Sequence, residues 1–418
     1  MRLQLAGLWR HADFMRLWTS QTILAIGSSI TFLALPLTAV LALDATPAQM
    51  GLLTVAETTP ALLIGLFVGV WVDRHRRRRI LIAANLGRAI ALILIPVGAI
   101  LGLLSINHLY AATFLVGALA PFSDVAGTSF LPSLVGRDRL IEGNSKLAMG
   151  RSVAEIVGSG VGGWLVQLVT APVAIAVDTI PFLISALFLG RIQTPEPAPR
   201  PSDAAQTVWR EIGEGLRLVA GSRLLRPIAA CIAMMGLFNS VLEAIFVLYV
   251  TRELGIEPGL LGITFASGSV GFLLGALLPG RVTRQFGLGP AIIGGLLLVG
   301  LSDLLVPMAG TSAGIAMTTT ILIVAQILFG LGFVVFNTGQ VSLRQAITPD
   351  RLQGRMNGTM SFISEAVVPL GGLLGGGLGE VIGLRSTLWL AAIGEILAVL
   401  WLLLSPMRSL HSRPEVMG

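Results

Sequence analysis

The sequence contains little charge. Of its 418 residues, 12% are Asp, Glu, Lys or Arg and 54% are hydrophobic, and the mean hydropathy is +0.85. Soluble domains carry about 25% charged residues, and a soluble fold this apolar would lack polar surface to cover its core. The composition excludes an ordinary soluble protein and favours one whose solvent is lipid.

Residues that carry chemistry are also scarce. Cys231 is the only cysteine, which excludes an internal disulfide. The only lysine, Lys146, stands between Ser145 and Leu147, so no Gly-Lys-Ser/Thr phosphate loop exists in this sequence. The four histidines are not paired at metal-ligand spacing. We therefore expect no bound cofactor, no metal site and no enzyme activity.

The basic residues are placed as in a membrane protein. The pI is about 10.8, but the net charge is only +6. With both termini in the cytoplasm, 24 of the 28 Lys and Arg fall in cytoplasmic segments, and only Arg252 and Arg385 fall in outer loops. This asymmetry argues against nucleic-acid binding. It predicts a multi-pass cytoplasmic-membrane protein, and the 27 Arg to 1 Lys suggests the GC-rich coding of a bacterium.

The apolar runs are long enough to cross a membrane, which takes about 20 residues as a helix. We predict an all-α membrane protein with twelve transmembrane helices in two pseudo-symmetric six-helix bundles, residues 1–190 and 227–418. The predicted spans are 14–43, 47–72, 80–105, 108–134, 147–170, 172–190, 227–251, 258–280, 289–310, 313–341, 356–380 and 384–405.

Residues 191–226 separate the two sets of spans. Thr194–Ser202 reads TPEPAPRPS, a proline-rich linker that does not favour a helix. Downstream, apolar residues recur at helical spacing and predict an amphipathic helix that lies on the cytoplasmic surface. Its expected apolar face consists of Val208, Ile212, Leu216 and Val219.

The two halves share markers at nearly constant spacing, which indicates duplication. Parallel repeats of this kind place a transport site between the halves near the middle of the membrane. The recurring markers are Gly65-x-x-x-Gly69 with Gly271-x-x-x-Gly275, Asp138-Arg139-Leu140 with Asp350-Arg351-Leu352, and Glu155 with Glu365.

The loop after the second span carries the most specific motif. Gly69, Asp73, Arg74, Arg77 and Arg78 match Gly-x-x-x-Asp-Arg-x-Gly-Arg-Arg, although Arg76 replaces the second glycine. This motif resembles that of the major facilitator superfamily. Two interpretations stay open: a positively charged anchor, or a gate in which Asp73 pairs with a basic residue or a helix N-terminus. The copy in the second half has Pro279 at the acidic position.

A glycine-rich segment, Gly158–Gly163, resembles the antiporter motif of that superfamily, with serine in place of proline. The segments Leu134–Gly150 and Asp178–Phe182 and the proline-rich central linker make the chain similar to the transmembrane secretion effectors. That branch includes macrolide-efflux-like and enterobactin-exporter-like proteins. The resemblance implies export by exchange, a cavity lined by helices 1, 4, 7 and 10, and a monomer.

Ionisable residues inside spans are costly and usually have a partner or a role. Arg88 and Asp124 lie at similar depths, so we expect a pair, either structural or opened by a proton or substrate. Arg151 and Glu155, spaced i,i+4, can neutralise each other and contribute to gating. We interpret Asp178 as a local cap.

Glu243 has no basic residue nearby in its own span, and Asn239 lies one turn before it. We hypothesise that Asp124 or Glu243 couples protons to substrate, with Glu57 and Glu365 as secondary candidates. Asp303 and Glu395 belong to spans expected at the periphery. Polar residues expected to line the cavity are Gln21, Ser28 and Thr31 of the first span and Gln326, Asn337 and Gln340 of the tenth.

These observations favour a secondary active exporter of a small amphiphilic molecule, drug-like or siderophore-like, that works by proton antiport with alternating access. The mostly apolar lining, without an arginine cluster, argues against a phosphorylated cargo. A lipid or lysolipid flippase is the alternative within transport. A membrane sensor or assembly factor is the alternative outside it, although the sequence offers no soluble output domain.

Overall fold

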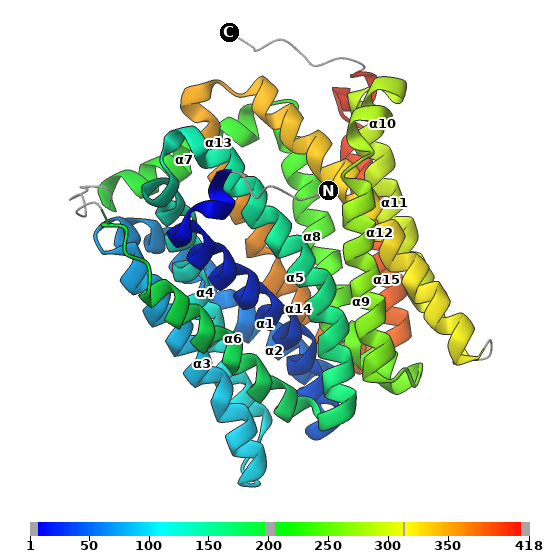
Figure 1. Cartoon of the computed structure of the whole chain (residues 1–418). Helices are drawn as coiled ribbons and strands as arrows, with labels where there is room; N and C mark the ends of the chain where they lie inside the picture. The colour runs from blue at the N-terminus through cyan, green and yellow to red at the C-terminus, as the bar shows by residue number, and fades with distance from the viewer. Residues whose placement is uncertain (1–6, 197–204, 312–313, 411–418) are drawn as a thin grey trace, which may run out of the picture. The chain divides into compact units, whose positions relative to one another are not determined.

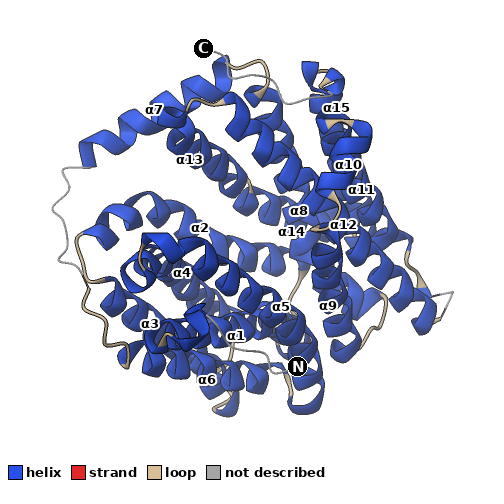
Figure 2. Ribbon diagram, turned by 45° about the horizontal axis from the view of Figure 1, so that its top comes forward, coloured by secondary structure: helices blue, strands red, loops and turns tan. Residues whose placement is uncertain are grey.

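The computed structural model describes residues 7–196, 205–311 and 314–410, and the regular structure in these ranges is entirely helical (Figures 1 and 2). The first half contains α1 (Ala12–Ala42), α2 (Pro47–Asp73), α3 (Arg77–Ile100), α4 (Ile106–Val135), α5 (Leu140–Val169) and α6 (Ala171–Gly190). The second contains α7 (Ala205–Gly221), α8 (Leu225–Leu248), α9 (Pro258–Gly275), α10 (Pro279–Phe286), α11 (Leu288–Met308), α12 (Ile315–Ile347), α13 (Asp350–Ala366), α14 (Val368–Ile382) and α15 (Leu384–Leu403).

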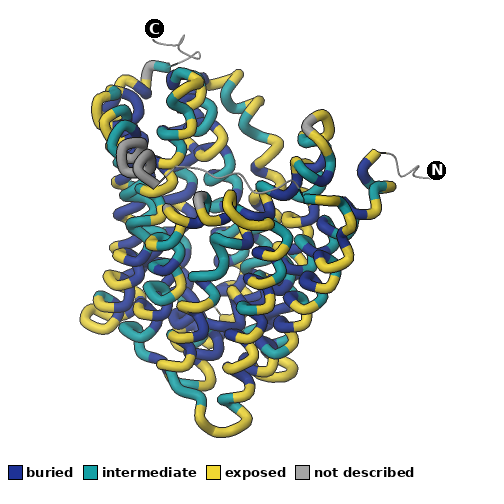
Figure 3. Tube along the Cα trace, turned by 90° about the vertical axis from the view of Figure 1, so that its left-hand side faces the viewer, coloured by how far each residue is buried: buried dark blue, intermediate teal, exposed yellow. Residues whose placement is uncertain are grey.

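Among these described residues, 11 helical segments are long and apolar enough to cross a membrane, and the bent helix α2 makes up to 12. The predicted all-α membrane fold is therefore confirmed. Large apolar side chains are exposed along the helices, for example Ile100 at 81%, Leu168 at 75% and Val381 at 82% (Figure 3). In water such surfaces would aggregate, whereas in lipid they need no cover.

The described part of the chain forms two compact units, one within residues 1–45 and 56–204 and the other within 46–55 and 205–418. The start of α2 packs with the second unit because glycines allow backbones to meet. A Cβ on Gly51 would lie 2.4 Å from the Gly372 carbonyl oxygen and 2.9 Å from the Gly376 Cα. Helix α2 thus begins in the second unit and continues in the first.

The same pattern of helix pairs occurs inside each unit. In the first, α1 packs on α5 and α6, and α3 packs on α4 and α6. In the second, α8 packs on α14 and α15, and α11 packs on α12 and α15. This repetition of neighbours agrees with the duplication that the sequence markers indicate.

The helix over one predicted span, 356–380, is interrupted at Val367 and consists of α13 and α14, which together form one candidate span, Asp350–Ile382. Pro369 has no backbone N–H, so it cannot donate to the carbonyl of Glu365 four residues earlier. The N–H of Val367 donates to that carbonyl instead, and α13 ends at Ala366. The break places Glu365 in the last turn of α13.

The predicted amphipathic helix is α7, and it packs on α13 in the second unit. A Cβ on Gly215 would lie 2.9 Å from the Arg355 carbonyl oxygen, and Arg355 forms an ion pair with Glu214. Val219 is buried, but Leu216 is 44% exposed, so the contact face differs from the predicted one. The side chains of Val208 and Ile212, and residues 197–202 of the predicted linker, lie outside the described residues.

The turn between α5 and α6 holds a strained residue. Thr170 has φ 93° and ψ 153°, while Gly383, at the matching turn between α14 and α15, has φ 85° and ψ 159°. Only glycine adopts this region readily.

We therefore expect Thr170→Gly to raise the free energy of unfolding by about 1–3 kcal/mol. Thermal unfolding of the full chain in detergent measures the change. Thr170→Ala is the matched control, because it removes the hydroxyl and keeps the strain, and it should not stabilise. A glycine variant no more stable than wild type would contradict the assignment of strain.

Candidate functional site

A buried polar network crosses the first unit. Asn85 of α3 donates from Nδ2 to Ser185 Oγ of α6 over 2.9 Å and accepts from Ser123 of α4 over 3.1 Å. The Ser185 hydroxyl lies 2.7 Å from the Ser20 hydroxyl of α1. All four residues are buried. The network fixes the register of four helices, since an unpaired polar group in this core would be costly.

Asp178 lies in the core of the same unit and is not the helix cap that we expected. It is fully buried, and the Thr31 hydroxyl of α1 donates to its Oδ2. Its Oδ1 has no hydrogen-bond partner. The carboxyl fits only because Gly27 has no side chain, since a Cβ there would lie 2.2 Å from Oδ1. Thr31, which is 9% exposed, therefore binds Asp178.

Arg88 does not form the expected direct pair with Asp124. Its guanidinium carbon lies 4.8 Å from the centre of the Phe182 ring, and its Nε has no hydrogen-bond partner. The carboxylates of Asp124, Asp178 and Glu57 each act on its charge. Arg88 thus interacts electrostatically with three acids at longer range, while its guanidinium lies over an aromatic ring.

Four predicted residues of the first unit are exposed within spans: Glu57 on α2, Asp124 on α4, and Arg151 and Glu155 on α5. Arg151 acts electrostatically on both Asp124 and Glu155, and neither acid forms an ion pair with it within 4.0 Å. Charged groups are not stable against hydrocarbon. We therefore expect these four charged side chains to contact water rather than lipid.

The second unit carries its own exposed acids. Glu243 of α8 is exposed between buried neighbours, and it forms no hydrogen bond or ion pair with the residues that the structure describes. Glu365 is also exposed. On α12, Asn337 is exposed and accepts from the buried Gln340 Nε2 over 2.9 Å, whereas Gln326 is half-buried.

An acid pair that the sequence analysis undervalued lies inside the second unit. Asp303 of α11 and Glu395 of α15 are 5% and 0% exposed; their carboxyl groups interact with each other, and that of Glu395 also interacts with the Asn239 amide of α8. Two facing carboxyl groups repel each other unless at least one carries a proton. Their sequence positions did not indicate that the two acids face each other, because each is isolated within an apolar span.

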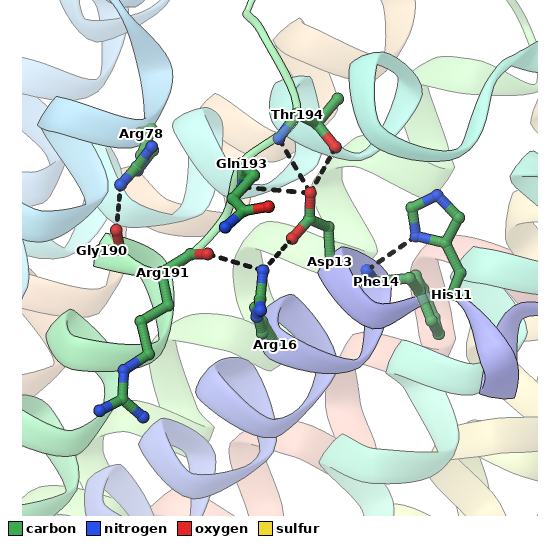
Figure 4. A network of polar contacts seen from close by, with 9 residues as sticks. All are labelled: His11, Asp13, Phe14, Arg16, Arg78, Gly190, Arg191, Gln193 and Thr194. Carbon is green, nitrogen blue, oxygen red and sulfur yellow. Dashed lines mark hydrogen bonds and ion pairs between the residues drawn. The ribbon is translucent and has the colours of Figure 1, made fainter.

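The segment that follows α6 is bound to the end of the first unit (Figure 4). Asp13 Oδ2 accepts from the Gln193 N–H over 3.1 Å, and from the Thr194 N–H and hydroxyl over 2.8 and 2.6 Å. Arg16 bridges Asp13 and the Arg191 carbonyl, at 2.6 and 2.7 Å. Buried side-chain contacts to backbone of this kind fix a segment that has no regular structure.

The predicted gate motif adds to this attachment. Asp73, which is exposed, lies 3.5 Å from Arg77, and Arg74 is exposed in the turn after α2. The Glu196 side chain accepts from the backbone N–H groups of Arg77 and Arg78. Glu196 thus occupies the N-terminus of α3, a favourable place for an anion. Arg78 also donates to the carbonyl of Gly190.

The glycines of this motif behave differently in the two halves. A Cβ on Gly69 would meet nothing within 4 Å, so Gly69 makes no close helix contact here. Its counterpart Gly275 does, because a Cβ there would lie 3.1 Å from Leu331 Cα. Close packing at the motif is therefore a property of the second half in this conformation.

Comparison with known proteins gives the family. The family model described as "Transmembrane secretion effector" matches residues 4–416. The chain is 28% identical to the multidrug efflux pump Tap of Mycolicibacterium fortuitum, over 86% of this chain and 88% of that protein. It is 26% identical to the enterobactin exporter EntS of Salmonella typhimurium, over 99% and 97%.

Solved structures agree on the fold. A bacterial homologue of the iron transporter ferroportin, in an inward-facing state, superimposes with a TM-score of 0.74 at 18% identity, covering 97% of this chain and 100% of that one. The nucleoside transporter NupG superimposes with a TM-score of 0.77 at 12% identity, covering 94% and 98%. The chain belongs to the transmembrane secretion effector family of the major facilitator superfamily, whose members are membrane transporters and not enzymes.

Proposed function

We propose that this transporter exports a small amphiphilic molecule, drug-like or siderophore-like, from the bacterial cytoplasm in exchange for protons, by alternating access. The observation that carries the proposal is the presence of exposed acids in spans, above all Asp124 and Glu243, which form no contact ion pair with described residues. An acid in such a position can bind and release a proton as its surroundings change between water and protein.

Two further observations support the proposal, one on the direction of transport and one on its energy source. Relatives of this chain over most of its length are a multidrug efflux pump and an enterobactin exporter. The sequence has no phosphate-binding loop, so energy for uphill transport has to come from an ion gradient or from another protein. We place the protein in the cytoplasmic membrane as a monomer with both termini inside, in contact with lipid.

Transport by the purified full chain in proteoliposomes tests the proposal. An imposed pH gradient should drive a dye, a macrolide or a catecholate siderophore across the membrane, and a protonophore should abolish that movement. Protein-free liposomes are the control. Movement of lysolipid alone would favour a flippase instead. If no compound in the panel responds to the gradient, proton antiport of this class of cargo is refuted.

A further inference from the structure

A buried arginine in the second unit has no hydrogen-bond or ion-pair partner among the residues that the structure describes. Arg344 lies on α12, one turn before the helix ends at Ile347, and is 9% exposed. Its Nε makes no hydrogen bond, and its guanidinium forms no ion pair with any described residue. No acidic side chain acts on its charge. Leaving a permanent charge buried and unpaired costs several kcal/mol.

Two more polar groups on the same side of α12 are unsatisfied. Gln340 and Thr348 lie four residues before and after Arg344, and this spacing places all three side chains on one helix face. Both residues are 3% exposed. The Oε1 atom of Gln340 and the hydroxyl of Thr348 have no hydrogen-bond partner. Gln340 Oε1 can only accept a hydrogen bond, whereas Arg344 Nε and the Thr348 hydroxyl can donate. Because buried polar groups are normally paired, the two unmet donors indicate a missing acceptor ligand beside Arg344 and Thr348.

The next helix adds positive potential at the same place. Helix α13 begins at Asp350, two residues after Thr348, and its N-cap, Pro349, offers no side-chain acceptor to the free N–H groups of the first turn. The Asp350 side chain is exposed and accepts a hydrogen bond from Gln353 over 3.1 Å. A helix N-terminus favours an anion, as does a guanidinium.

We propose that Arg344, Thr348 and the start of α13 bind one oxyanion, a phosphate or carboxylate group. The guanidinium provides charge and paired donors, and the Thr348 hydroxyl donates a further hydrogen bond. Such a group reaches the site either on a lipid headgroup or on a water-borne molecule. The sequence analysis missed this site because it counted Arg344 among loop residues, whereas α12 extends six residues beyond the predicted span end at 341.

Thermal unfolding of the full chain in dodecyl maltoside, a detergent without phosphate or charge, tests the proposal. Phosphatidylglycerol and inorganic phosphate are titrated separately at constant ionic strength, and the rise in Tm gives an apparent affinity. Wild type should be stabilised by at least one of them. Arg344→Gln should bind about tenfold or more weakly, the effect of losing about 1.4 kcal/mol from a charge-assisted contact. Arg344→Lys should fall between the two.

Arg139→Gln is the matched control, because it removes an exposed arginine at the equivalent position of the first unit, outside the proposed site, and should keep wild-type affinity. Thr348→Val provides a second, milder variant that keeps the charge. Stabilisation by phosphatidylglycerol alone would assign the site to lipid, and stabilisation by inorganic phosphate as well would assign it to water-borne anions. No stabilisation of wild type, or equal stabilisation of Arg344→Gln, would overturn the proposal. This binding test does not depend on proton antiport.

Discussion

Proteoliposomes that contain Asp124→Asn or Glu243→Gln should lose pH-driven transport, with rates falling to those of protein-free liposomes. The amides keep the size and hydrogen-bonding capacity of the acids but cannot exchange a proton. Asp124 and Glu243 are exposed and form no contact ion pair with described residues, so the substitutions break no such pair and the fold should persist. The initial rate of cargo movement under an imposed pH gradient measures the effect.

Two measurements separate loss of coupling from loss of transport. Exchange of labelled for unlabelled cargo, without a pH gradient, should continue in whichever of Asp124→Asn and Glu243→Gln has lost pH-driven transport. Asp138→Asn, which changes an exposed acid in the turn between α4 and α5, should transport at the wild-type rate. Full pH-driven transport by both Asp124→Asn and Glu243→Gln would rule these acids out. Attention would then move to the buried pair of acids, Asp303 and Glu395.

The sequence was sufficient for the fold because lipid imposes a single rule. Every backbone polar group must be satisfied within its own helix, so each run of about 20 apolar residues becomes a span. The exceptions have local causes. The helix over the predicted span 356–380 is interrupted because Pro369 breaks its hydrogen bonds, and α12 continued past residue 341 because polar residues can extend a helix beyond the apolar core.

The candidate site was less predictable, because a sequence does not show which helix faces meet. The depth argument placed Arg88 and Asp124 at one level in the membrane. It could not show that the Arg88 guanidinium lies over the Phe182 ring, or that Asp178 also interacts electrostatically with Arg88. The facing of Asp303 and Glu395 depends on how α11 and α15 cross. Isolated acids in apolar runs look alike in sequence, whether they end up paired or exposed.

Adjacent glycines on α11 should differ sharply in their tolerance of a side chain. A Cβ on Gly295 would lie 2.7 Å from the Phe336 backbone nitrogen and 2.9 Å from the Gly332 carbonyl oxygen of α12. Backbone atoms cannot rotate away, so the two helices would have to separate along their contact. We expect Gly295→Leu to lower the free energy of unfolding by at least about 3 kcal/mol and to reduce the yield of folded protein.

Gly294 is the matched control. It is exposed, and a Cβ there would meet nothing within 4 Å, so Gly294→Leu should change the free energy of unfolding by no more than about 0.5 kcal/mol. The two variants share composition, helix and added volume, and differ only in the face that receives the leucine. Size-exclusion profiles and unfolding temperatures in one detergent compare them directly. Equal stability would mean that α11 and α12 do not meet at Gly295, and the register of the second unit would then be wrong.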